Sequence, residues 1–205
     1  MSRILTAANQ SSLIRLAATL PKGDESRRVI LSRLKVALRL KQFEALIKMG
    51  QKFGVLSAYG HGKKSENKQR NVDLYKELQK RGYKKIIPLR GKWQGVAEKS
   101  VLVPGMSFQD LLDLGKKFEQ DSVIYKDPSG VVGMYYQKDG EAEFAVADDG
   151  TIAATWDANK EHYSKARGMS FEFGFLWGQR VPWNGSTPYT RKGLERLLES
   201  GQLTP

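Results

Sequence analysis

A glycine-rich basic loop offers the clearest chemistry in this sequence. Residues 59–64 read Tyr-Gly-His-Gly-Lys-Lys, follow the apolar run 53–58, and lead into a helical pattern that opens at Ser65. The first N–H groups of a helix have no partner within the helix, so a strand, a glycine turn and a helix N-terminus together can hold an anion. The cationic side chains of this candidate phosphate site are His61, Lys63, Lys64 and Arg70.

The loop departs from a P-loop at both ends. That motif has a glycine five positions before its Gly-Lys pair, and Ser or Thr directly after it. Here Ser57 stands at the first position and Lys64 at the last. The later predicted strands also lack the terminal acid that would hold magnesium. We therefore expect a loose phosphate-binding loop or an ordinary surface turn, rather than a nucleotide hydrolase.

Polar side chains around this loop form a second candidate site. Glu66, Asn67 and Arg70 share much of one surface of the predicted helix, because residues three and four apart are neighbours on a helix. Arginine with asparagine suits a phosphate and a nucleobase edge, and a glutamate can act as a base. A solvated helix surface is the alternative. The candidate ligand cleft comprises Ser57, Tyr59, Glu66, Asn67, Asn71, Trp93 and Glu98.

Composition excludes several classes of site. The chain has no cysteine, which removes disulfides, thiolate zinc sites and cysteine nucleophiles. Its two histidines, His61 and His162, lie far apart in the sequence. We expect no metal site and no cofactor. No apolar run approaches the roughly 20 residues that span a bilayer, and the N-terminus lacks a signal-peptide pattern. The sequence therefore predicts a soluble, intracellular protein without a membrane partner.

Positive charge is the strongest global signal. The formal net charge is +12, from 34 Lys and Arg against 22 Asp and Glu. Residues 1–50 hold ten basic and three acidic residues, or +7. A field of this sign concentrates polyanions such as nucleic acid near the protein. A solvated surface or contacts with acidic proteins are the alternatives.

The first quarter of the chain predicts a basic helical hairpin. One helix is expected from residue 11 or 12 through 20, and a longer one from residue 24 or 26 to about 49. The longer helix is apolar on two sides, with Arg28, Lys35 and Arg39 on the ridge between them. Such a helix packs against two neighbours or against a partner chain, and leaves the ridge for solvent or phosphate.

The remaining pattern predicts an α+β fold. Helices are expected over residues 65–81, with Val72, Tyr75 and Leu78 inward, and after a cap at Ser107. From residue 121, short strands alternate with turn signals, which favours an antiparallel meander. We expect a central mixed or antiparallel sheet flanked by two helices. The predicted strands are residues 53–58, 84–89, 99–103, 122–125, 131–137, 141–147 and 151–156.

An aromatic segment closes the chain. After a polar linker over residues 157–168, Phe171, Phe173, Phe175 and Trp177 alternate with other residues, and a short helix is expected over residues 190–200. Four rings on one strand face can stack unpaired bases, at about 1–3 kcal/mol per base, or close a core. The predicted domains are 1–50, 51–156, and an extension over 157–205 that packs on the central domain.

The central region resembles a known domain family. The matching features are residues 54–59, the Glu66-Asn67…Arg70-Asn71 helix, Gly82-Tyr83, residues 98–105, and Leu111 to Gln120. Over about residues 53–137 the chain resembles a small domain of unknown function found in bacterial and bacteriophage proteins. Members commonly keep a Glu-Asn…Arg helix after the first strand. The resemblance implies an α/β module, often phage-encoded, with no established reaction. It also implies a location in the cytoplasm of a host cell or in association with a virion.

These observations favour a phage-type accessory protein that binds polyanions without catalysis, with nucleic acid as the leading ligand. A structural component of a virion or other assembly, with the N-terminal helices as its protein interface or self-association surface, is the second hypothesis. The third is an enzyme or sequestering protein for a nucleotide-like ligand in the candidate cleft.

Overall fold

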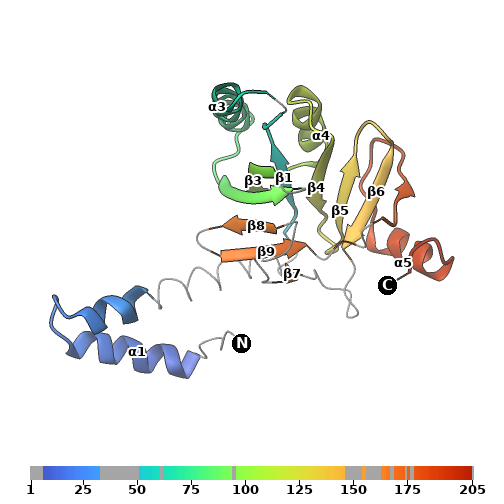
Figure 1. Cartoon of the computed structure of the whole chain (residues 1–205). Helices are drawn as coiled ribbons and strands as arrows, with labels where there is room; N and C mark the ends of the chain where they lie inside the picture. The colour runs from blue at the N-terminus through green and yellow to red at the C-terminus, as the bar shows by residue number, and fades with distance from the viewer. Residues whose placement is uncertain are drawn as a thin grey trace. The chain divides into compact units, whose positions relative to one another are not determined.

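The chain forms two compact units, Met1–Leu46 and Ile47–Pro205. The computed structural model in Figure 1 describes residues 7–32, 51–60, 62–93, 96–145, 154–155, 163–166, 169–173, 175 and 178–204. The second unit includes both the predicted central domain and the predicted C-terminal extension.

The first unit contains the start of the predicted helical hairpin. Helix α1 (Ala7–Thr19) begins before the predicted residue 11, since the preceding Ala-Ala-Asn-Gln run already favours helix. Residues 25–32 are helical, and the Asp24 carboxylate caps them by accepting hydrogen bonds from the backbone N–H groups of Ser26 and Arg27, at 2.7 and 3.2 Å. Ala17 and Ile30 are buried together between the two helical segments. The rest of the predicted second helix lies outside the described residues.

The second unit is built on an antiparallel sheet. The order of its described strands is β10-β6-β5-β4-β1-β3-β2-β8-β9-β7, and every described pairing is antiparallel. The predicted α+β class is confirmed, with an antiparallel rather than a mixed sheet. The strands are β1 (Phe53–Ser57), β2 (Ile87–Trp93), β3 (Val96–Pro104), β4 (Ser122–Lys126), β5 (Val132–Tyr136), β6 (Glu141–Ala145), β7 (Ala154–Thr155), β8 (Tyr163–Ala166), β9 (Met169–Phe173) and β10 (Val181–Pro182).

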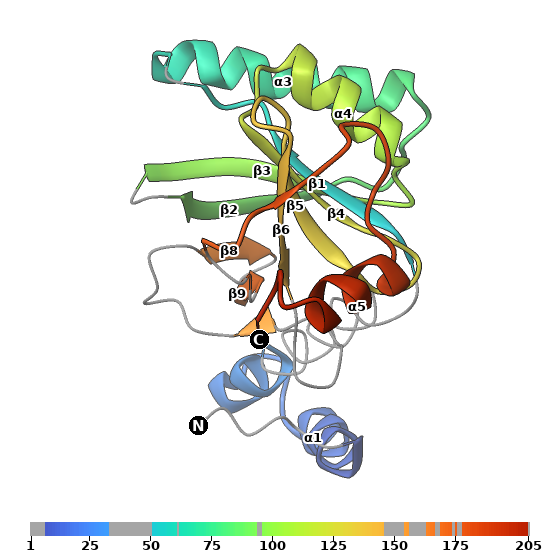
Figure 2. The same ribbon diagram turned by 90° about the vertical axis from the view of Figure 1, so that its right-hand side faces the viewer.

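Two helices cover one face of this sheet. Figure 2 shows α3 (Lys64–Lys80) and α4 (Phe108–Lys117) on the same side, with α5 (Arg191–Glu199) near β6. The predicted cap of α4 is confirmed, because the Ser107 hydroxyl accepts the Asp110 N–H at 3.1 Å. Within the described residues, no helix combines the length and the apolar character needed to cross a membrane.

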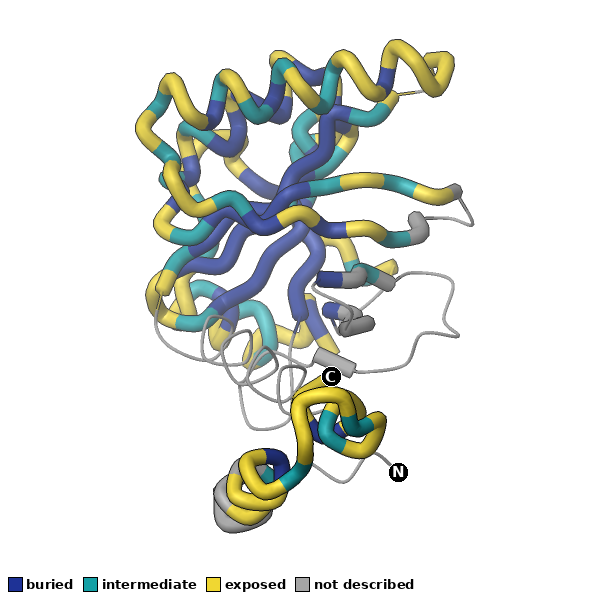
Figure 3. The backbone as a smooth tube through the Cα atoms, turned by 90° about the vertical axis from the view of Figure 1, so that its left-hand side faces the viewer, coloured by how far each residue is buried: buried dark blue, intermediate teal, exposed yellow. Residues whose placement is uncertain are grey.

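One of the three predicted inward positions of α3 is wrong. Leu78 is fully buried as predicted, and Tyr75 packs partly buried against the core. Val72, however, is 42% exposed, whereas Leu74 is fully buried. The inward surface also includes the buried polar Asn67, which a count of apolar residues alone does not find. Figure 3 shows the central strands as the buried layer.

The second face of the sheet is also buried, and aromatic rings contribute to it. The rings of Phe53 and Phe173 are 6.2 Å apart, and those of Phe173 and Phe175 are 5.9 Å apart. Phe173 and Phe175 are both buried. These two members of the aromatic run therefore pack in a core rather than stack bases.

The predicted polar linker over residues 157–168 contains a strand. Strand β8 pairs with β2, and β9 pairs with β8. A four-residue polar strand carries too weak an alternation to be recognised alone, and its pairing partner lies far away in sequence.

Candidate functional site

The glycine loop between β1 and α3 is held by one buried side chain. The carboxamide oxygen of Asn67 accepts the Gly60 N–H at 2.8 Å, and its NH₂ group donates to the carbonyls of Gly60 and Gly62 at 3.1 and 3.3 Å. Asn67 is only 8% exposed. Its hydrogen-bonding groups are thus used in shaping the loop.

The start of α3 is occupied by a carboxylate of the chain itself. Glu66 accepts the Lys63 N–H at 3.0 Å, which is the bond that the acidic N3 residue supplies in a capping box. A negative charge at this position is stabilised by the helix dipole. An external anion would have to displace Glu66 to use the same N–H group. His61, the other predicted member of this site, lies outside the described residues.

Arg70 joins three segments of the second unit. Its Nε donates to the Ala58 carbonyl at 2.7 Å, its Nη1 contacts Glu119 Oε2 at 3.0 Å, and its Nη2 donates to the Phe118 carbonyl. The guanidinium therefore connects the end of β1 to the end of α4, and its charge is paired.

Ser57 and Glu98 lie on the other face of the sheet. Leu56 packs with α3, and successive strand residues alternate in direction, so Ser57 faces away from that helix. Its hydroxyl donates to the Lys99 carbonyl at 2.8 Å and accepts the Tyr59 N–H at 2.9 Å. Burial raises the pKa of Glu98, and a hydrogen bond with Ser57 partly offsets this shift.

The candidate cleft set is therefore divided between two faces. Glu66 and Asn67 belong to the loop and α3, whereas Ser57 and Glu98 face away from that helix. Asn71 is half-buried on α3 and forms no hydrogen bond through its side chain within the described residues. Trp93 ends β2, and its side chain is outside the described part of the structure.

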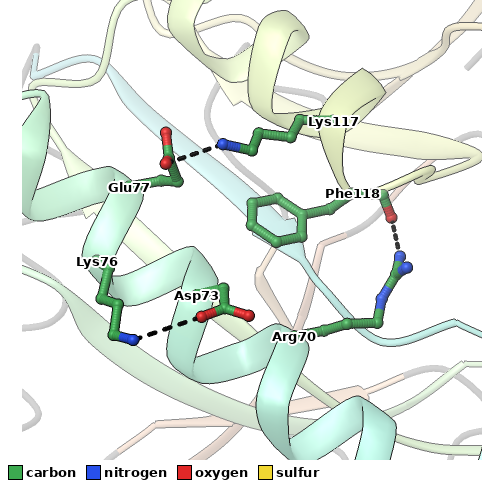
Figure 4. Close-up of a pocket in the computed structure, with 6 residues that line it drawn as sticks. All are labelled: Arg70, Asp73, Lys76, Glu77, Lys117 and Phe118. Carbon is green, nitrogen blue, oxygen red and sulfur yellow. Dashed lines mark hydrogen bonds and ion pairs between the residues drawn. The ribbon is translucent and has the colours of Figure 1, made fainter.

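A cavity of about 370 Å³ lies between α3 and α4. Figure 4 shows the Phe118 ring in it, surrounded by charged side chains. Lys117 Nζ is 2.8 Å from Glu77 Oε1, and Lys76 Nζ is 3.6 Å from Asp73 Oδ1. The hydrogen bond from Lys117 is the main cause that lowers the pKa of Glu77. Because its charges pair with one another, this cavity offers little net attraction to an ion.

The start of α3 in the second unit has several basic side chains without ion pairs to other described residues. Lys63, Lys64 and Lys68 are exposed at the start of α3, and none of them forms an ion pair within the described part of the chain. Residues 63–99 hold twelve basic and four acidic residues, whereas residues 100–145 hold four basic and eight acidic residues. The charge of this unit is thus strongly segregated along the chain.

Two basic residues that we did not select from the sequence belong to the same segment. Arg90 of β2 and Lys99 of β3 are exposed and directly opposed in the strand register. The alternation of buried Ile87 and Leu89 with Arg90 was the signal that could have found them. In the first unit, Arg28 is exposed as predicted, while Lys35 and Arg39 lie outside the described residues.

Comparison with known proteins identifies a family without a known activity. Residues 61–123 match the model of a family described as "Protein of unknown function (DUF3293)". This span lies within the predicted segment 53–137, and it confirms the resemblance to an uncharacterised domain. It includes α3, the β2–β3 pair and α4. A search of curated proteins found no match to this chain.

Proposed function

We propose that this protein binds polyanions without catalysis, with nucleic acid as the leading ligand. The observation that carries the proposal is the basic surface at the start of α3. Lys63, Lys64 and Lys68 are exposed there without ion pairs to other described residues. Cations that are left unpaired near one another favour a ligand with many negative charges.

The loop geometry favours a polyanion over a small phosphate ligand. A small phosphate would need the free N–H groups of the loop and the helix start, but Asn67 and Glu66 already accept the N–H groups of Gly60 and Lys63. Lysine side chains that reach outward can still neutralise the phosphates of a long chain. Two polar side chains that could have bound a nucleotide, Glu66 and Asn67, instead hold the loop.

A salt series tests this proposal. Labelled single-stranded and double-stranded DNA and RNA are titrated with the full chain, from about 20 to 200 mM salt. We expect log affinity to fall linearly with log salt, with a slope of about −0.9 per neutralised phosphate of duplex DNA. The triple variant K63Q/K64Q/K68Q should flatten that slope by about 2 to 3.

A charge-matched control completes the design. Lys116, Lys192 and Arg196 are exposed outside the proposed surface, so K116Q/K192Q/R196Q removes the same charge with a much smaller expected effect. No binding at low salt, or an equal loss in both triple variants, would remove the proposal. In the same assay, R28Q/K35Q/R39Q measures the contribution of the N-terminal ridge.

A second candidate function is assembly through the N-terminal helices. Leu16, Val29 and Leu31 are 49%, 45% and 41% exposed, so this unit presents large apolar side chains at its surface that a protein partner could cover. Light scattering tests this candidate. We expect self-association that is lost in L16S/V29S/L31S. A monomer at all accessible concentrations would contradict self-assembly.

A further inference from the structure

We propose that Arg90 and Lys99 form a second phosphate-contacting row on the β2–β3 pair, which binds a phosphodiester backbone independently of base sequence. This inference rests on the proposed polyanion binding and names a surface and a ligand class for it. Neither residue belongs to the candidate sites recognised from the sequence.

The strand pattern points both side chains away from the second-face core. In β2, Ile87 and Leu89 are 4% and 1% exposed, whereas the alternate residues Pro88 and Arg90 are exposed. Side chains alternate along a strand, so Arg90 projects from the opposite face. Its register partner Lys99 is also exposed.

The row extends over three adjacent strands in the backbone register. Arg90 pairs with Lys99 of β3 on one side and with Lys165 of β8 on the other. Like charges directly opposed across antiparallel strands destabilise a sheet. Other charged residues of the second unit do form ion pairs, as in Lys117 with Glu77 and Lys138 with Asp121. Arg90 and Lys99 form no ion pair within the described residues.

A polyanion would relieve this repulsion, and the dimensions suit a nucleic-acid backbone. Adjacent strands lie about 4.8 Å apart, so three strands place their basic positions across about 10 Å. A strand of duplex DNA carries one phosphate per about 3.4 Å of helix axis. The row therefore matches a few consecutive phosphates.

The row lies on the same face of the sheet as α3. Lys99 is two residues from Val101, which is buried in the core that includes Leu74 of α3. In Figure 2 the N-terminal end of α3 and the hairpin end of β2–β3 lie on the same side of the unit. One ligand can thus contact both basic groups.

The exposed surroundings of the row do not favour base readout. Pro88 lies two residues from Arg90 in β2, and Ala97 lies two residues from Lys99 in β3. Both are exposed on this face, within the described residues. Neither side chain can read a base edge by hydrogen bonding. Phosphate contacts position a nucleic acid, whereas base contacts specify its sequence. We therefore expect similar affinity for duplexes of unrelated sequence.

The test compares R90Q/K99Q with the wild type in the same salt series, using two 20-base-pair duplexes of unrelated sequence and one matching single strand. We expect the slope to flatten by about 2 for each duplex. We also expect a higher Tm for the free variant, because the opposed charges are removed. The control is K84Q/K85Q, which removes two exposed lysines just before β2 and should have the smaller effect on binding.

The outcomes separate this inference from the proposed function. If K63Q/K64Q/K68Q loses affinity and R90Q/K99Q does not, the row is wrong and polyanion binding stands. If the wild type binds no nucleic acid, both fail. If R90Q/K99Q loses binding and also has a lower Tm than the wild type, Arg90 and Lys99 stabilise the fold, and the proposed phosphate-contacting row is wrong. A tenfold preference between the duplexes would overturn sequence independence.

Discussion

At the residue scale, Asn67 shows how a functional-looking side chain can instead serve the fold. It lies in the Glu-Asn…Arg pattern that carries the family resemblance, and it makes three hydrogen bonds to the glycine loop. Arg70 of the same pattern joins β1 to α4. The pattern is therefore explained by the local architecture of the loop, without any ligand.

Asn67→Ala should destabilise the protein by about 2–3 kcal/mol, because it removes the three hydrogen bonds that this buried side chain makes to the loop, each contributing about 0.5–1.5 kcal/mol. Asn71→Ala is the matched control on the same helix, and it should change the free energy of unfolding by less than about 0.5 kcal/mol. Urea denaturation measures both. Equal stability of the two variants would refute the role of Asn67 in holding the loop.

Asp110 should make stability depend on acid pH. Burial opposes its ionisation, but hydrogen bonds from Tyr83, Ser107 and Arg81 together outweigh burial and lower its pKa. A lowered folded pKa gives stability that is present above the unfolded value of about 4 and lost as pH falls through the folded pKa.

The stability gap between wild type and Asp110→Asn should therefore be largest near pH 7 and should shrink below about pH 4. Urea unfolding at pH 7, 5 and 3 measures the gap. Asp113→Asn is the control, since Asp113 is 46% exposed and 3.7 Å from Arg81, and exposed pairs contribute little. A gap that stays constant with pH would show that the Asp110 contacts do not depend on its charge.

At the element scale, α4 is positioned by a close approach to the sheet. A Cβ atom at Gly115 would lie 2.8 Å from Val123 Cγ1 of β4 and would also collide with Gln137 Oε1. Gln137 is held in place by its hydrogen bond to the Leu112 carbonyl at 2.9 Å. Glycine therefore permits a helix–sheet contact that any larger residue would force apart.

Gly115→Ala compares two opposing effects on stability in α4, helix propensity and overpacking. Alanine favours helix by about 1 kcal/mol over glycine, but overpacking costs about 1–3 kcal/mol, so we expect a net loss of about 1 kcal/mol. Gly193→Ala in α5 is the control, where a Cβ would meet Tyr189 Cδ1 at 3.3 Å and have room to adjust. Thermal unfolding of both variants measures the two changes in stability. A stabilised Gly115→Ala protein would mean that the contact is loose.

At the scale of the whole molecule, the uncompensated net charge of +12 should govern the response to salt. Self-repulsion of like charges destabilises the compact state, and salt screens it. Salt also weakens ion pairs, but the exposed pairs contribute only about 0–1 kcal/mol each. Repulsion should therefore dominate.

Raising the ionic strength from about 20 to 200 mM should increase the Tm of the free protein by a few degrees. Duplex DNA should raise the Tm more at the lower ionic strength, since binding stabilises the folded state and weakens with salt. Calorimetry measures both effects. A Tm that falls as salt is added would show that ion pairs outweigh self-repulsion.

Local signals were sufficient for much of the fold. The Ser107 cap, with Asp110 three residues later, predicted α4 and is confirmed. The turn residues between the strands predicted the meander of β4, β5 and β6, which pair as neighbours. Caps and turns depend on residues a few positions apart, so the sequence alone contains them.

The sequence by itself thus determined the α+β class, several helix caps and the excess of positive charge. Only the tertiary structure decided that Asn67 is buried, that β8 pairs with β2, and that Arg90 and Lys99 are opposed. The physical reason is that register and burial arise between segments far apart in the chain. The sequence around a polar side chain or a short polar strand does not indicate which distant segment it will contact.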